Sequence, residues 1–433
     1  MKKVLQLLRL VFPLVIMLCA ALVHAQTWSD LKQTCGDAVE HPNRFRIEDC
    51  GRVYLAMPVR PVIKTIAPGG GFGGGLRAIH DFTPKARWNK EISGTAAVST
   101  NRFLFLEGDI LFERPAFACT GKSECPVKDN FQIELYTRRV ELPGLAYYGH
   151  GNATTQQTHV QFGERWFEGG VKVLDPVLSW LDIGGEVGYV VPHIGPIPNS
   201  SIPSIESLFN DTQAPGLTEQ PGFMHYKILA LPHYPAILPF KLDYQIGYEY
   251  YQDLDVHRFS FHKFEADLIN MRPLRWRRKA VPASPNAARD WFCTPQGAGK
   301  VCTLGYIAIN GLLTLETAAQ QQIPFYFQPT IGGADLADRD TLRGFLDLRF
   351  RAPDRMVLQG EYGHNIWGPL GILVFYETGR VGNRASDLGF SGLHHDVGVG
   401  VTLSVQNRIL MRAYIGFGTG EGSRMNWKAG PLL

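Results

Sequence analysis

The chain has 433 residues, of which 45% are hydrophobic and 11% aromatic, and its 43 basic side chains nearly balance 40 acidic ones. That much apolar side chain can support a folded core, which excludes a disordered protein. Only one uncharged apolar run approaches the roughly 18 residues that a membrane helix needs. It lies at the N-terminus, so a bundle of membrane helices is excluded as well.

Residues 1–25 form a predicted secretory signal peptide. Lys2, Lys3 and Arg9 are its basic leader, residues 11–23 its apolar stretch, and Ala25 ends a small-residue cleavage site. Cleavage there removes three positive charges and no negative ones, which brings the formal net charge from +3 to 0. No basic patch then remains to indicate a nucleic-acid partner.

Residues 26–60 are expected to form a short periplasmic arm closed by a disulfide. The six cysteines after the signal peptide fall into three pairs that are close in sequence, which in a secreted chain favours three local disulfides. No CxxC or clustered Cys/His pattern indicates zinc, so no metal is expected. The pairs are Cys35 with Cys50, Cys119 with Cys125, and Cys293 with Cys302.

From residue 61 onward, apolar and polar side chains alternate with a period of two. Residues 242–250 place Leu, Tyr and Ile on one face and Asp, Gln, Gly and Glu on the other, and the pattern recurs at 131–135, 396–405 and 409–418. Charge and glycine in mid-strand suit a wet lumen, and aromatics near the strand ends suit a lipid interface. A soluble β-sandwich alternates similarly, but one domain rarely runs this long without a linker.

The alternation therefore predicts an all-β protein, a transmembrane antiparallel β-barrel over residues 61–433. About 16 strands are predicted, and an even number lets both chain ends lie on the periplasmic side. The glycine run at 69–75 has no helical pattern after it, so it indicates a flexible hairpin or an easily unzipped strand and no nucleotide loop. The strands are expected near 61–68, 74–82, 91–100, 103–114, 131–142, 158–174, 180–192, 222–234, 240–252, 257–272, 304–316, 356–366, 371–382, 394–405, 408–418 and 424–433.

Residues 323–350 read IPFYFQPTIGGADLADRDTLRGFLDLRF and contain, in order, PF at 324–325, GG at 332–333 and RGF at 343–345. A strand with Gln359 and Glu361, a strand with Glu377 and glycine-rich closing strands follow. By this ordered set the chain resembles the bacterial surface antigen family, the barrels of BamA and TamA. The match covers about residues 322–420. Residues 149–152 (GHGN) and 214–217 (APGL) also resemble the family, but more weakly.

The resemblance implies that residues 323–350 lie in a long extracellular loop that folds back into the lumen. A loop ordered there loses chain entropy and needs anchors, and a guanidinium offers a rigid fork to a carboxylate. Strand parity lets Glu361 and Glu377 point inward, within reach of Arg343. The family usually has aspartate at position 377. The candidate loop anchor is Arg343, Gly344, Phe345, Glu361 and Glu377; the alternative is a solvated arginine and two ordinary lumen acids.

Two features depart from the family. Its members carry periplasmic domains before the barrel, and residues 26–60 are too few for even one, because two average helices and three average strands need about 37 residues. The chain also ends on Leu433 where an aromatic residue usually closes the assembly signal. We therefore expect a partner to deliver the substrate.

The resemblance implies protein assembly or translocation at the bacterial outer membrane, by a barrel whose first and last strands pair poorly and part. No catalytic residue or cofactor is expected, and the partners are outer-membrane lipid and a periplasmic or membrane protein. A gated or passive pore with the 323–350 loop as plug remains an alternative. An outer-membrane lipid enzyme is a further alternative, but strand alternation places the neighbours in His394-His395-Asp396 on opposite faces.

Overall fold

The structure is a computed structural model that describes residue 33 and residues 57–82, 88–114, 131–197, 200–233, 241–279, 293–296, 299–318, 322–367, 369–405 and 408–429. The predicted signal peptide and most of the predicted arm lie outside these residues. So do the predicted pairs Cys35–Cys50 and Cys119–Cys125. These parts of the domain scheme stay predictions.

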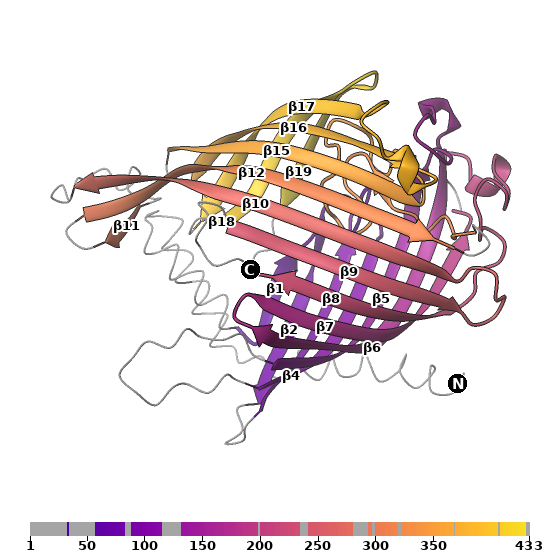
Figure 1. Ribbon diagram of the computed structural model, residues 1–433, viewed down its shortest axis with the longest axis horizontal. Coiled ribbons are helices and arrows are strands. Elements are labelled where there is room, and N and C mark those ends of the chain that lie inside the picture. The colour runs from indigo at the N-terminus through magenta and orange to yellow at the C-terminus, as the bar shows by residue number, and fades with distance from the viewer. Residues whose placement is uncertain are drawn as a thin grey trace.

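The described chain consists mainly of antiparallel strands, which form a 17-stranded sheet (Figure 1). Among the described residues there is no helix both long and apolar enough to cross a membrane. The first ten strands are β1 (Val59–Ile63), β2 (Gly73–Phe82), β3 (Asn89–Ser99), β4 (Leu104–Arg114), β5 (Phe131–Tyr147), β6 (Val160–Leu178), β7 (Leu181–Gly195), β8 (Phe223–Pro232), β9 (Lys241–Asp253) and β10 (Phe261–Lys279). The others are β11 (Cys293–Gln296), β12 (Gly299–Thr317), β15 (Asp354–Trp367), β16 (Leu370–Gly382), β17 (His394–Val405), β18 (Arg408–Gly418) and β19 (Gly422–Ala429).

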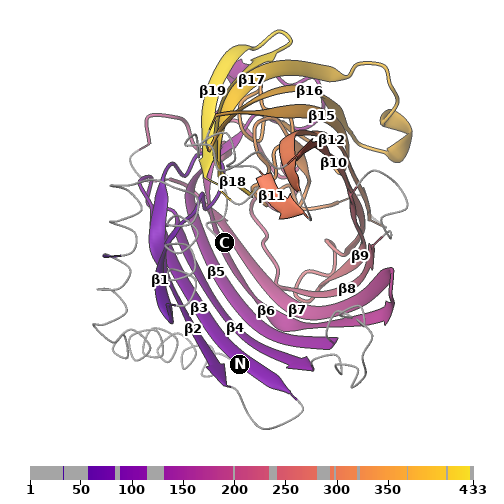
Figure 2. The ribbon, with the colours of Figure 1, turned by 90° about the vertical axis from the view of Figure 1, so that its left-hand side faces the viewer.

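Each strand pairs with the next one along the chain from β1 to β10, and then through β12 and β15 to β19. The short β11 pairs only with the start of β12, so sixteen strands follow one another around the wall. Figure 2 shows this wall curling around the chain segment between β12 and β15. The predicted class, an antiparallel barrel of about 16 strands, is confirmed.

The outward face of the wall is apolar. On β17 the side chains of Val397, Val399 and Val401 point outward, with exposed fractions of 49%, 54% and 54%. The neighbouring Asp396 points inward and is 2% exposed. The same alternation holds on β16, where Tyr376 is exposed and Glu377 is buried. A continuous apolar band of this kind suits contact with lipid and would be a liability in water.

The hairpin of β10 and β12 is longer than the sequence predicted. The predicted strands ended at 272 and began at 304, whereas the ladder runs to Lys279 paired with Gly299, and β11 was not predicted at all. The sequence at 275–279 is rich in arginine and lacks the apolar alternation that served as the signal. Backbone pairing between neighbouring strands continues beyond the apolar band, because the ladder does not require apolar side chains.

The wall has a seam where β19 faces the first strands. On one side β19 pairs with β18, and among the described residues no ladder joins its other edge to β1 or β2. The backbone N–H of Trp427 in β19 donates instead to the side chain of Asn426, at 2.8 Å. The rings of Phe72 and Trp427 approach to 5.8 Å across the seam, beside a cavity of about 250 Å³.

Candidate functional site: the loop inside the barrel

The segment between β12 and β15, here called the lumen loop (residues 322–353), turns back into the barrel (Figure 2). It contains the separate two-stranded pairing of β13 (Thr330–Ile331) with β14 (Phe350–Arg351). Phe325 is fully buried, with its ring 5.3 Å from that of Tyr147 and 5.1 Å from that of Phe162. Burying an aromatic side chain of this size contributes about 1.5 to 3 kcal/mol, so Phe325 is one reason why the loop stays inside.

The two glycines of the GG pair occupy a turn that side chains would obstruct. Gly332 has a φ of +110° and Gly333 a φ of +56°. A Cβ at Gly333 would lie 1.9 Å from Oδ1 of Asp347, and one at Gly332 would lie 2.5 Å from Cβ of Arg349. This part of the sequence pattern therefore reflects a close turn at which the loop packs on itself.

Arg343 lies between the two glutamates that the sequence placed within its reach. Its Nε donates to Oε1 of Glu377 at 2.7 Å, and its Nη1 donates to Oε2 of Glu361 at 2.6 Å. The backbone N–H of Arg343 also donates to Oε2 of Glu377, at 2.6 Å. The guanidinium carbon stands 3.7 Å from the ring centre of Phe375. One arginine thus joins the loop to both β15 and β16.

Gly344 lies directly on β17 and β18. Its N–H donates to Oδ2 of Asp396, and a Cβ at this position would lie 2.7 Å from the backbone N of Gly418. A Cβ at Gly416 would in turn lie 2.7 Å from the Cα of Gly344. The glycine-rich closing strands are therefore explained by the close approach of the loop backbone. Phe345 is buried beside Phe350 and His394.

The loop is also tied to the last two strands by charge. Lys428 on β19 stands 3.1 Å from Oδ1 of Asp340, and Arg412 on β18 stands 3.3 Å from its Oδ2. Arg424 on β19 pairs with Asp347 at 2.7 Å. The strand at the seam is therefore held from inside the barrel by side-chain pairs to the lumen loop.

A second group of charges fixes the loop to β10 and β15. Asp335 accepts from Nη1 of Arg355 at 2.9 Å and from Nε of Arg339 at 3.0 Å. Arg339 also donates to Glu265 on β10, at 2.6 Å. The loop therefore bridges β10 and β15 on one side and β18 and β19 on the other.

The two segments that resemble the family more weakly, 149–152 and 214–217, both contact the lumen loop. In the 149–152 segment, the N–H of Gly151 donates to the carbonyl of Arg351 at 2.7 Å. In the 214–217 segment, the carbonyl of Pro215 accepts from the N–H of Phe325 at 2.8 Å. Gly216 has a φ of +82°, and a Cβ there would lie 3.0 Å from Cβ of Pro324. The 149–152 segment therefore meets the end of the lumen loop, and the 214–217 segment meets its start.

The remaining residues singled out from the sequence lie elsewhere. Cys293 and Cys302 form a disulfide at the start of β12, the end away from the lumen loop. His394 stacks on Phe350 inside the barrel, whereas the neighbouring His395 stacks on the exposed Tyr376 on the outer face of the wall. The two histidines do not converge on one site.

Sequence reasoning missed two members of the anchor, Asp396 and Arg412. Asp396 was considered as a polar residue of an alternating strand and as part of the His394-His395-Asp396 run, and Arg412 as a polar residue of the next strand, but neither was assigned to the loop. Their inward position on glycine-rich strands was the available signal. Nothing in the sequence itself indicated that the loop would lie against that face of the wall.

Solved structures with the same fold are barrels. One is the crystal structure of BamA from Haemophilus ducreyi lacking POTRA domains 1–3, with a TM-score of 0.52 and 10% sequence identity. The superposition covers 86% of this chain and 70% of the BamA chain. CdiB from Escherichia coli matches 86% of this chain with a TM-score of 0.50 and 9% identity, and this chain spans 62% of that protein. No family model and no curated protein matches the sequence. The chain has the BamA and CdiB barrel fold.

Proposed function

We propose that the protein is an outer-membrane barrel of the BamA and TamA type that takes part in the assembly or translocation of other proteins, with a partner supplying the substrate. The observation that carries the proposal is the edge of β19, which has no strand ladder in the described part of the chain on the side facing β1 and β2. The fold shared with BamA and CdiB supports it.

A strand edge of this kind presents a row of backbone donors and acceptors. Such a row pairs with any extended chain that reaches it, which is the physics of strand addition. In lipid the drive to pair is stronger, since water is not available to satisfy the same groups. A client segment added at β19 would therefore gain backbone hydrogen bonds without any catalytic group, and the proposed function involves no enzymatic step.

The lumen loop gives this edge a fixed position. Lys428 and Arg424 hold β19 to loop aspartates, and Arg343 holds the loop to β15 and β16. The edge strand is thus attached to the barrel by β18 and by the loop, and it can separate from β1 and β2 without losing its own place. The side chains of Phe72 and Trp427 are the described contact that must part.

Photocrosslinking in cells tests the proposal. A photoreactive amino acid replaces Met425, which is 76% exposed on β19, and in a matched control it replaces Ile228, which is 65% exposed on β8. We expect adducts of newly exported outer-membrane barrels or secreted proteins at Met425 only, identified by mass spectrometry. Equal adducts at both positions, or lipid adducts alone at Met425, would refute the proposal.

A further inference from the structure

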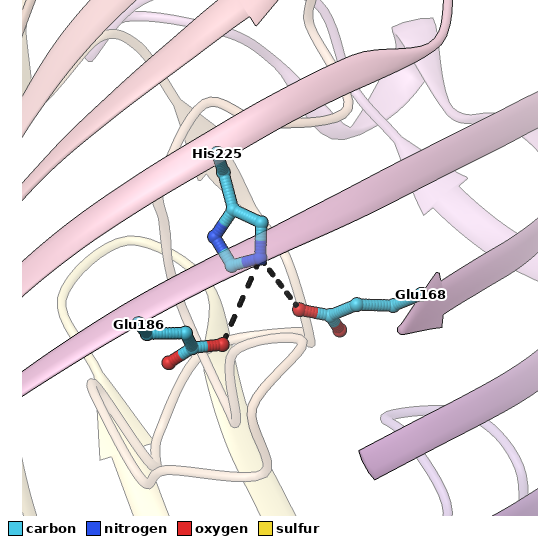
Figure 3. Close-up of side chains that lie close together, drawn as sticks. All are labelled: Glu168, Glu186 and His225. Atoms are coloured by element: carbon cyan, nitrogen blue, oxygen red, sulfur yellow. Dashed lines mark ion pairs between the residues drawn. The ribbon is translucent and has the colours of Figure 1, made fainter. Parts of the chain in front are cut away.

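Four neighbouring strands bring together a group of side chains that the loop anchor does not use. Glu168 on β6, Glu186 on β7 and His225 on β8 converge in the barrel interior (Figure 3). Nε2 of His225 lies 3.5 Å from Oε1 of Glu168 and 3.7 Å from Oε1 of Glu186. The hydroxyl of Tyr136 on β5 lies 3.2 Å from Nε2 of His225 and 3.2 Å from Oε1 of Glu168, and it donates to Glu186.

The register of the sheet explains why these side chains meet. Tyr136 stands opposite Gly170, Gly170 opposite Gly188, and Gly188 opposite His225, in one row across β5 to β8. A Cβ at Gly188 would lie 2.1 Å from Nε2 of His225 and 2.9 Å from the hydroxyl oxygen of Tyr136. The two glycines therefore leave a hollow into which the rings of Tyr136 and His225 lean from either side.

The two carboxylates come from the positions next to this hollow. Glu168 and Glu186 each precede one of the glycines by two residues, so they share its face of the sheet. Each faces the same space as the rings. The residue types are those that bind transition-metal ions, namely one imidazole nitrogen and oxygen donors.

We propose that Glu168, Glu186 and His225, with the Tyr136 oxygen as fourth ligand, bind a divalent transition-metal ion of the Zn²⁺ class. Zinc bonds to histidine nitrogen and carboxylate oxygen are about 2.1 Å long, and ligands at the corners of such a tetrahedron are about 3.4 Å apart. The His225 nitrogen and its three oxygen neighbours stand 3.2, 3.5 and 3.7 Å apart. The distances from His225 Nε2 therefore match those of the tetrahedron, and the Tyr136 hydroxyl, which hydrogen-bonds both glutamates, moves away from Glu186 to admit the ion.

The charge of the cluster also favours a cation. Two carboxylates whose oxygens lie within 4.8 Å of each other repel in an environment that is partly shielded from water. Arg138 approaches Glu168 to 4.0 Å. In the described part of the chain, the ion-pair partner of Glu186 is His225 alone, which is charged only when protonated. A divalent ion would compensate both carboxylates and leave the imidazole neutral.

The site has a route to the lumen. Glu168 and Arg138 line a cavity of about 490 Å³ that extends along the lumen loop. Tyr251 also lines it and stacks on the imidazole of His225 at a centroid distance of 5.5 Å, which fixes the ring. An ion bound here would cross-link β5, β6, β7 and β8, and its binding free energy would add to the stability of this wall.

The test uses the full-length protein purified in detergent, stripped of metal with a chelator and titrated with Co²⁺. We expect about one equivalent to bind, with the visible absorption bands of four-coordinate cobalt, and Zn²⁺ to abolish the bands by competition. His225→Gln and Glu186→Gln should lose both the bands and stoichiometric binding. His262→Gln is the matched control, because His262 on β10 is exposed and its ring nitrogen hydrogen-bonds the hydroxyl of Tyr248, far from the cluster in the sheet register.

Two outcomes would overturn the site. One is a wild-type protein that binds no Co²⁺ or gives no such bands, which would mean that the cluster is only a hydrogen-bond network. The other is a His225→Gln variant that keeps the bands while folded, as judged by heat-modifiable migration in gels. If the variants do not fold, X-ray absorption of the wild-type zinc form decides instead. One imidazole among oxygen ligands is expected, and a shell without imidazole refutes the assignment.

Discussion

Replacing Arg343 by alanine gives the sharpest test of the loop anchor. The change leaves Glu377, which is fully buried, and Glu361, which is largely buried, without their common guanidinium. Removing one partner of a buried ion pair costs about 3 to 5 kcal/mol, because the other charge stays desolvated. This cost applies only while the loop is inside the lumen, because an open loop lets water reach the two carboxylates. The substitution therefore shifts the equilibrium toward the open loop, while the barrel wall stays folded.

The magnitude can be measured by proteolysis of the loop. About 1.4 kcal/mol corresponds to a tenfold change in an equilibrium, so the ratio of open to closed loop should rise by roughly 10² to 4 × 10³. When the loop opens and closes faster than it is cut, the cleavage rate follows that population. Cleavage between residues 322 and 353 should therefore accelerate at least about 100-fold, while heat-modifiable migration in gels shows an intact barrel.

Arg258→Ala is the matched control, because Arg258 pairs with Glu219 at the surface, where both side chains are well exposed. Exposed pairs contribute about 0 to 1 kcal/mol, so this variant should be cut at nearly the wild-type rate. Glu377→Gln in the Arg343→Ala background should recover part of the loss, because it removes the buried charge. A cleavage rate in Arg343→Ala no different from that of Arg258→Ala would show that the anchor does not hold the loop.

Three further predictions concern the seam, the topology and the lumen. Burial raises the pKa of Asp340, but Lys428 and Arg412 outweigh it and hold the pKa below its usual range. The loop contact to β19 is therefore complete above about pH 4 and is lost as the pH falls through that lowered pKa. Pepsin cleavage of the loop should rise on acidification in the wild type and much less in Lys428→Met. Cys293 and Cys302 lie at the end of β12 away from the lumen loop, so a membrane-impermeant thiol reagent added to intact, reduced cells should spare them; strong labelling would invert the predicted topology. Deleting residues 331–345 should raise single-channel conductance in planar bilayers, and a protein that already conducts freely with its loop intact would favour the pore alternative.

The sequence alone determined the strands, because a period of two is a local property that one segment carries by itself. All sixteen predicted strands are present in the wall, and β10 and β12 differ mainly at their ends, where polar side chains continue a ladder held by backbone bonds. The pattern of residues 324–345 also located the loop. Its glycines have a local reason, since the turn at Gly332 and Gly333 leaves no space for a Cβ.

The tertiary structure decided which residues meet across the barrel. The sequence placed Glu361 and Glu377 within reach of Arg343, but only the position of the loop on β17 and β18 brought Asp396 to Gly344. Tyr136, Glu168, Glu186 and His225 lie on four separate strands and form no local motif. Their meeting depends on the register of three ladders and on the hollow above two glycines. Register is set by turns and by pairing over the whole wall, so no single segment of the sequence contains it.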